Sequence, residues 1–146
     1  MTPLIAVILL AGNVFSTVAV AQSNAPVPVL PDTLRWVSLP NGSESQAAWV
    51  LGAEQQPGPY IIRVKLATGA SIPPYTHPDE RTSTVLAGTL YVGFGETFDA
   101  TKVVAMPTGA VYVVPANVPH YSWAKDGEAM YQEVGVEPTG TSFITR

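Results

Sequence analysis

Two segments, GASIPPYTHPDER at residues 69–81 and GAVYVVPANVPH at residues 109–120, decide how this chain folds. Both begin with glycine, and they contain the only two histidines of the chain, His77 and His120. Short runs that alternate apolar and polar residues lie between and around them, separated by glycine. This pattern predicts a small β-barrel whose mouth is marked by the two histidines.

The rest of the chain continues the pattern of short runs separated by glycine and proline. Residues 60–66 are the clearest predicted strand, because every second side chain of this run is apolar and would lie on one face. Further strands are expected at 34–39, 47–51, 82–87, 89–94, 110–114, 121–124, 128–134 and 141–145. The turn signal Asp126-Gly127 predicts a hairpin between 121–124 and 128–134, and residues 97–104 are expected to form a loop or one short helical turn. About eight or nine strands without a convincing helix indicate an all-β sandwich or barrel.

Composition narrows the class of protein. The 146 residues suit a single domain, and 14 prolines with 12 glycines favour turns over long helices. A formal net charge of −4 gives no basic surface, so we expect no nucleic-acid partner. The absence of cysteine excludes disulfides, thiolate metal sites and a cysteine nucleophile. Any chemistry must therefore use histidine, carboxylates, hydroxyl groups or a bound metal ion.

The first 21 residues have the features of a secretory signal peptide. Residues 4–10 are apolar, the apolar character continues to Ala21, and Ala19-Val20-Ala21 fits the small-x-small cleavage pattern. No lysine or arginine precedes this run, and an uncleaved membrane anchor is the alternative, since roughly 18 apolar residues can span a bilayer. We expect a signal peptide at 1–21, an extended leader at 22–33 and a barrel domain at 34–146. Cleavage near Ala21 would give an exported protein, periplasmic or secreted.

The two opening segments are similar to the paired motifs of the cupin superfamily. The first cupin motif, G-x5-H-x-H-x3,4-E-x6-G, aligns from Gly69 to Gly88. The second, G-x5-P-x-G-x2-H-x3-N, aligns from Gly109 to Ala124, where this chain departs from the final asparagine. Both motifs occur in order, and their flanks resemble small exported bacterial single-domain cupins of unassigned activity. The resemblance implies a double-stranded β-helix, the cupin-type jelly-roll barrel.

The positions that bind a metal ion in many cupins are only half kept. In this chain they carry Tyr75, His77, Arg81 and His120. The resemblance implies one divalent ion (Fe, Mn, Ni or Zn) held by His77 and His120, with Glu80, one residue before the family's glutamate position, as the carboxylate. Asp79 and Tyr75 are alternatives for the third ligand. An inward Arg81 would oppose a cation and favour an anionic ligand, so a site without metal is also open.

Three functions are compatible with these residues. The first is a metal-dependent enzyme, oxygenase- or isomerase-like, that acts on a small molecule in a pocket around His77 and His120. The second is a binding module without metal, in which Tyr75 and Arg81 join the histidines to hold a small anion or carbohydrate without catalysis. The third is metal-free acid–base catalysis, with Tyr75 as the catalytic candidate. The sequence does not decide whether the chain is an enzyme; the expected partners are a small-molecule ligand and, by resemblance, a second copy in a homodimer.

Overall fold

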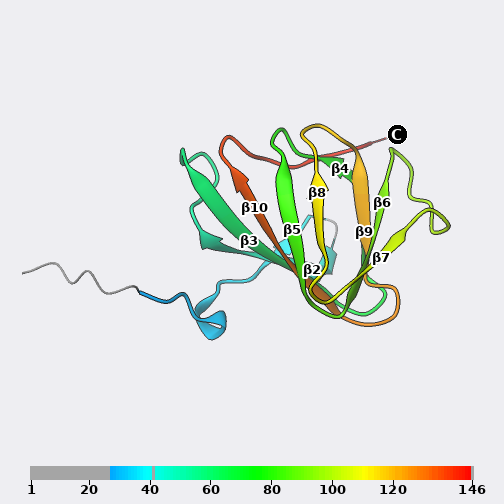
Figure 1. Cartoon of the computed structure of the whole chain (residues 1–146), viewed down its shortest axis with the longest axis horizontal. Coiled ribbons are helices and arrows are strands. Elements are labelled where there is room, and N and C mark those ends of the chain that lie inside the picture. The colour runs from blue at the N-terminus through cyan, green and yellow to red at the C-terminus, as the bar shows by residue number, and fades with distance from the viewer. Residues whose placement is uncertain (1–26, 41, 146) are drawn as a thin grey trace, which may run out of the picture.

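The computed structural model describes residues 27–40 and 42–145, which form two facing antiparallel β-sheets (Figure 1). One sheet has the strand order β1-β2-β3-β10-β5-β8 and the other β11-β4-β9-β6-β7. The elements are η1 (Pro31–Thr33, one 3-10 turn), β1 (Val37–Leu39), β2 (Gly42–Leu51), β3 (Pro59–Leu66), β4 (Ser71–Thr76), β5 (Arg81–Ala87), β6 (Thr89–Phe94), β7 (Val104–Pro107), β8 (Val111–Val114), β9 (His120–Trp123), β10 (Ala129–Val136) and β11 (Ser142–Phe143). From β3 onward most successive strands change sheet, which confirms the predicted jelly-roll barrel.

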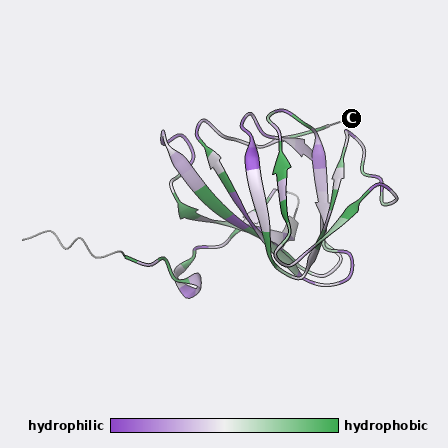
Figure 2. Ribbon diagram, in the orientation of Figure 1, coloured by the Kyte–Doolittle hydropathy of each residue, from purple (hydrophilic) through white to green (hydrophobic). Residues whose placement is uncertain are grey.

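Alternate residues of each strand form rows across the inner face of the larger sheet. Strand pairing aligns Trp49, Ile62, Glu133 and Ser83 in one row, and Ala47, Val64, Tyr131 and Val85 in the next. The second row packs with residues of the smaller sheet, such as Ile72, Leu90 and Val92, into one apolar core. Because the strand period is two residues, hydropathy changes within single strands (Figure 2). The first row instead places the buried carboxylate of Glu133 in the interior.

Two strands and one connection differ from the prediction. Strands β4 and β7 were not predicted as strands, because they contain Pro73, Pro74 and Pro107 and proline argues against a strand. The hairpin predicted across Asp126-Gly127 is wrong: β9 pairs with β4 and β6, whereas β10 pairs with β3 and β5. The link therefore crosses from one sheet to the other, since long-range pairing outweighs a local turn signal. Residues 97–103 form a loop that contains a turn at Asp99–Lys102.

The N-terminal predictions lie largely outside the described residues. The signal peptide at 1–21 and leader residues 22–26 are not among them. Within the remaining leader, residues 27–30 have no regular structure, and Pro31–Thr33 form a 3-10 turn instead of an extended segment. Across the described ranges, no helix combines the length and apolar character needed to cross a membrane. Export stays a prediction.

Gly88, the last residue of the first motif, joins β5 to β6 where no larger residue fits. Its φ is +71°, and a Cβ atom there would clash with the backbone carbonyl oxygen of Glu128. We expect Gly88→Ala to lower the free energy of unfolding by about 2–4 kcal/mol, through left-handed strain plus the backbone clash. Gly109→Ala is the matched control, because Gly109 has φ +88° but nothing within 4 Å of the position that a Cβ atom would take. Urea unfolding measures both, and equal losses would contradict the clash.

Candidate functional site

The two motif segments lie side by side. His77 directly follows β4, His120 begins β9, and Tyr75 pairs with His120 across the β4–β9 ladder. The backbone N–H of Asn117 donates to the carbonyl of His77 at 2.7 Å. Asn117 has φ +62°, a left-handed conformation that asparagine tolerates, and it stands where the family motif has glycine. The substitution therefore preserves the turn that positions His120.

Each histidine is oriented through its Nδ1 atom. Nδ1 of His77 lies 2.6 Å from the carbonyl oxygen of Gly140, and Nδ1 of His120 lies 3.0 Å from that of Val118. Because a carbonyl oxygen can only accept, Nδ1 donates in both rings, and in the neutral ring Nε2 keeps a lone pair. Both Nε2 atoms are buried and have no hydrogen-bond partner among the described residues. Since an unsatisfied buried acceptor costs about 1–3 kcal/mol, these two atoms are arranged to receive a donor or a cation.

Burial keeps both imidazoles neutral. The two histidines are each 2% exposed. Burial, helped by the Arg81 guanidinium, lowers the pKa of His77 to about 4, and burial also lowers the pKa of His120. Neutral imidazole is the form that accepts a hydrogen bond or binds a metal ion. At neutral pH the site therefore presents two uncharged nitrogen lone pairs.

Tyr75 packs against both histidine rings. Its ring centroid lies 4.2 Å from that of His120 and 5.0 Å from that of His77, and the histidine centroids are 5.3 Å apart. Burial, followed by the charge of Glu133, raises the pKa of Tyr75 to about 12. The phenol consequently stays protonated at neutral pH and interacts with Tyr131 and Ser122. In this form it packs and hydrogen-bonds, but it supplies no anionic metal ligand.

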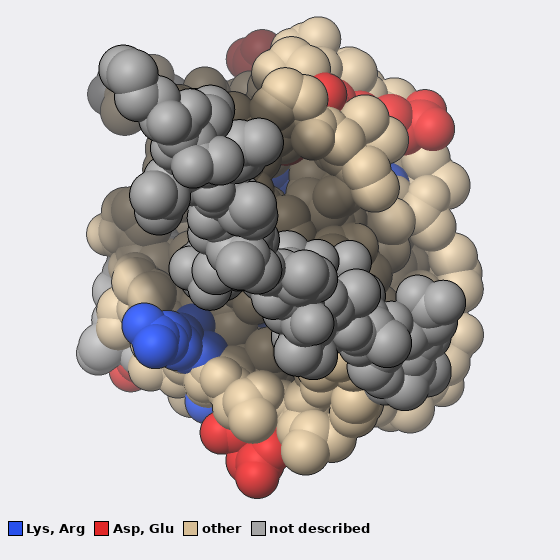
Figure 3. Space-filling model, turned by 90° about the vertical axis from the view of Figure 1, so that its left-hand side faces the viewer, with Lys and Arg blue, Asp and Glu red and all other residues tan. Residues whose placement is uncertain are grey.

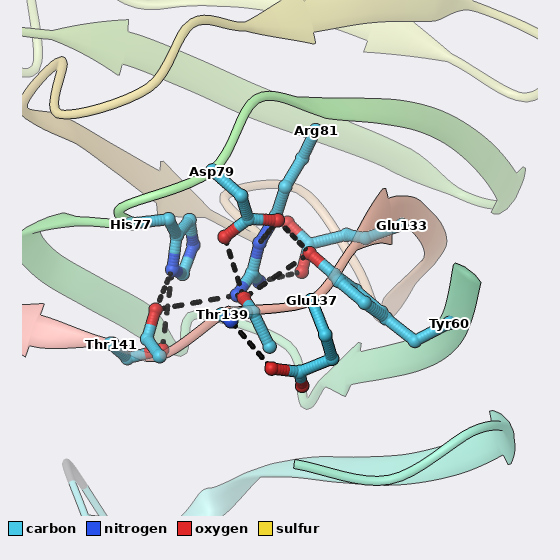
Figure 4. Close-up of polar contacts among 9 residues, drawn as sticks. Tyr60, His77, Asp79, Arg81, Glu133, Glu137, Thr139 and Thr141 are labelled. Atoms are coloured by element: carbon cyan, nitrogen blue, oxygen red, sulfur yellow. Dashed lines mark hydrogen bonds and ion pairs between the residues drawn. The ribbon is translucent and has the colours of Figure 1, made fainter. Parts of the chain in front are cut away.

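Arg81 is bound by the protein itself (Figure 4). Nη1 donates to Oε2 of Glu133 at 2.6 Å, and Nη2 donates to Oγ1 of Thr139 at 2.7 Å and to the carbonyl of Gly140 at 3.4 Å. Nε lies 3.7 Å from Oδ2 of Asp79. Arg81 is 4% exposed and Glu133 3% exposed, so this is a buried ion pair. Arg81 was predicted to bind a ligand, but most of its N–H donors already point at protein atoms.

The same cluster holds residues 139–143, the C-terminal strap, over the site. Oγ1 of Thr139 donates to Oδ1 of Asp79 at 2.6 Å, and the Tyr60 hydroxyl donates to Oδ2 of that carboxylate. The last two residues of the strap form β11, which pairs with Thr76 and Tyr75 of β4. In Figure 1 the chain after β10 runs across the end of the barrel toward the C-terminus. Residues from two distant parts of the sequence thus close one wall of the site.

A cavity of about 380 Å³ lies between the sheets and under the strap. His77, Tyr75, Arg81 and Glu133 line one part of it, while His120 lies behind the first two residues. Strap residues Thr139–Thr141 and Phe143 form another wall. Its volume lies within the range typical of small-molecule sites, about 300–1,000 Å³. The cavity makes this cluster the candidate binding site of the barrel.

The structure gathers most of the predicted site residues but not all of them. Tyr75, His77, Arg81 and His120 are buried together. Glu80, the predicted carboxylate ligand, has an exposed side chain and does not line the cavity. The buried carboxylate is that of Glu133, which was not predicted from the sequence. The alternation of its strand indicates only that Glu133 lies on the same face as Tyr131. Its ion-pair partner, Arg81, is 52 positions away in the sequence. Asp79, predicted as an alternative ligand, instead accepts hydrogen bonds from Thr139 and Tyr60 beside Arg81.

The donor set falls short of what a divalent ion requires. Such ions normally take three or more protein ligands, and the two histidines supply two. No group of three or more His, Cys, Asp or Glu side chains within the described residues is placed to hold one. The near carboxylates are engaged by Arg81, Thr139 and Tyr60, and the Arg81 charge opposes a cation. The residues therefore fit a pair of hydrogen-bond acceptors better than a metal centre.

Comparison with known proteins agrees with the family that the two motifs suggest. A family model described as a cupin domain matches residues 62–132. Germin-like protein 5-1 from Oryza sativa subsp. japonica is 33% identical over 92 residues, covering 60% of this chain. The chain spans only about 40% of the length of that relative.

Two solved structures share the fold at low sequence identity. KdgF from Halomonas sp. has a TM-score of 0.61 and 17% identity, covering 77% of this chain and 94% of KdgF. The polyketide cyclase RemF from Streptomyces resistomycificus has a TM-score of 0.65 and 17% identity, covering 84% of this chain and 89% of RemF. From the family match, the two motifs and the barrel together, this chain is a member of the cupin superfamily.

Proposed function

We propose that the protein is a binding module for a small, neutral, hydroxyl-bearing organic molecule, held in the barrel cavity without a metal ion of its own. The observation that carries this proposal is the pair of buried Nε2 atoms of His77 and His120, which have no partner among the described residues. Both rings are fixed with Nδ1 toward a carbonyl, so both Nε2 atoms accept. A ligand hydroxyl that donates to Nε2 of His77, which lines the cavity, is the simplest group that satisfies one of them.

An anionic ligand suits this site poorly. The two lone pairs would repel an anion, and the Arg81 guanidinium already neutralises Glu133 at 2.6 Å. On the uncovered part of the face in Figure 3, acidic and basic side chains lie in separate groups. We therefore favour a neutral ligand that donates a hydrogen bond over the small anion that the sequence suggested.

A metal-dependent enzyme of the oxygenase or isomerase type is the second candidate. The same two Nε2 atoms favour it, because metal-binding histidines also donate their other ring nitrogen to a carbonyl or carboxylate. This function requires a third ligand from outside the set of described side chains. Metal binding separates the two candidates directly.

Calorimetric titration with hydroxylated probes tests the proposal. Phenol and myo-inositol each carry donors, and anisole is phenol with its hydroxyl methylated. We expect phenol to bind about tenfold or more tightly than anisole, because anisole leaves the buried acceptors unsatisfied. His77→Phe, which keeps a ring but removes Nε2, should abolish that advantage in protein whose melting shows it is folded.

Two outcomes would refute the binding proposal. One is equal affinity for phenol and anisole combined with no binding of myo-inositol. The other is a phenol affinity that is unchanged in folded His77→Phe and His120→Phe. Export and the homodimer expected from the sequence stay predictions.

A further inference from the structure

The cavity is lined by one cluster of polar side chains and by many apolar side chains. His77, Arg81, Glu133 and Thr139 form this cluster, and three of these four side chains are bonded to one another. The rest of the lining is largely aliphatic and aromatic, including Leu39, Trp49, Ile62, Val64, Ile72 and Phe143. The uncovered part of the hollow in Figure 3 is drawn almost entirely in the colour of uncharged residues. Glu54, which is exposed, adds a carboxylate to the lining outside this cluster, whereas the buried polar partners for a ligand lie at the histidine end.

Trp49 gives the apolar lining a fixed aromatic face at the mouth. It pairs across β2–β3 with Ile62, and both residues line the cavity. Its ring stands edge-on to Tyr60, with centroids 5.6 Å apart, and Tyr60 is anchored to Asp79 of the Arg81 cluster. Trp49 is nevertheless 37% exposed, so part of its ring is accessible. A ring-shaped ligand would cover this surface and be held by it.

A carbohydrate matches this lining less well than a compound with a single polar end. A sugar carries hydroxyls around its whole ring, and each one placed against the apolar side chains without a partner weakens binding. An apolar ring with one hydroxyl end avoids this loss, because its single O–H donor can pair with Nε2 of His77. Burial of its ring removes apolar surface from water and so strengthens binding.

We infer that the ligand is an amphipathic ring compound, a phenol or alicyclic alcohol, whose hydroxyl points to His77 and whose ring lies against Trp49. This inference rests on the proposed function and narrows it to one ligand class. It also assigns Trp49 as the residue that selects rings over polyols. The volume of about 380 Å³ accommodates a compound of one or two rings.

Titration of the full chain with 2-naphthol, phenol and myo-inositol tests the ligand class. We expect 2-naphthol to bind most tightly and myo-inositol at least tenfold more weakly than phenol. Trp49→Ala should weaken 2-naphthol binding about tenfold, and Trp49→Phe should restore most of it. Trp36→Ala is the matched control: Trp36 lies outside the cavity lining, with Lys65 Nζ 4.3 Å from its ring centroid, and its loss should leave the affinity unchanged.

The outcomes separate this inference from the proposal beneath it. Binding of myo-inositol that equals 2-naphthol and depends on His77 would overturn the ligand class and leave the binding module intact. An unchanged 2-naphthol affinity in folded Trp49→Ala would overturn the role of Trp49. Failure of all three probes to bind would overturn both the inference and the proposed function.

Discussion

Tyr75→His is expected to create a zinc site in the barrel, with roughly one Zn²⁺ bound per chain where the parent retains almost none. Residue 75 is the first-motif histidine position of the cupin pattern, and the Tyr75 ring centroid already lies 4.2 Å from that of His120 and 5.0 Å from that of His77. An imidazole there would complete three nitrogen ligands, with water as the fourth, as in catalytic zinc sites. Calorimetric titration with Zn²⁺ and elemental analysis measure the change.

Tyr75→Phe is the control for this substitution. It keeps the ring that packs against both histidines and supplies no nitrogen, so it should stay as metal-poor as the parent. A folded Tyr75→His protein without bound zinc would show that the histidines do not converge on one ion. A parent that binds Zn²⁺ as tightly as the variant would show that Tyr75 is no barrier to a metal centre.

Arg81→Met is expected to cause the largest loss of stability, about 3–5 kcal/mol in the free energy of unfolding. The substitution leaves the Glu133 carboxylate, 3% exposed, without the guanidinium that lies 2.6 Å from it. It also removes the donors to Thr139 and Gly140, which hold the C-terminal strap. Urea unfolding measures the stability, and amide hydrogen exchange over residues 139–143 should become faster.

A second change at the partner isolates the ion pair. Arg81→Met combined with Glu133→Gln should recover part of the loss, because the unpaired buried charge is then removed. Arg35→Met serves as the control, since Arg35 is exposed, and it should stay within about 0.5 kcal/mol of the parent. A single variant as stable as the parent, or a double variant no better than Arg81→Met, would contradict a buried ion pair that anchors the strap.

The sequence predicts the scaffold of the site better than its internal connections. Glycines at 69, 88 and 109 and the positions of His77 and His120 indicate the barrel, because turn residues and strand alternation act locally. Strand β4 escaped notice because Pro73 and Pro74 remove backbone donors that a strand normally uses. The β9–β10 hairpin was wrong because its turn signal says nothing about which sheet each strand joins.

The polar cluster was beyond sequence reasoning for a similar reason. Arg81 meets Glu133 and Thr139 only after β5, β10 and the strap come together, and no spacing in the chain marks those contacts. Glu80 was chosen as the carboxylate by its nearness to the motif position, but its side chain is exposed. The alternation of β10 does place Glu133 on the same face as Tyr131, and this is the one signal that could have found it.

These findings describe a cupin barrel in which an arginine–glutamate pair and a tyrosine stand where many relatives would hold an ion. The guanidinium of Arg81 supplies a fixed positive charge inside the barrel, bound to Glu133 and to the strap. Each of the two histidines is oriented by a hydrogen bond from its Nδ1 to a backbone carbonyl. Their Nε2 atoms have no partner within the described part of the chain. We propose that these substitutions change the kind of occupant, from a cation toward a hydrogen-bond donor.

The most direct test is a calorimetric titration of phenol into untagged protein before and after removal of divalent metal ions with a chelator. The account predicts the same affinity in both samples, together with its loss in folded His77→Phe. Phenol binding that disappears on chelation and returns when Zn²⁺, Mn²⁺, Fe²⁺ or Ni²⁺ is added would contradict it and establish a metal centre at His77 and His120.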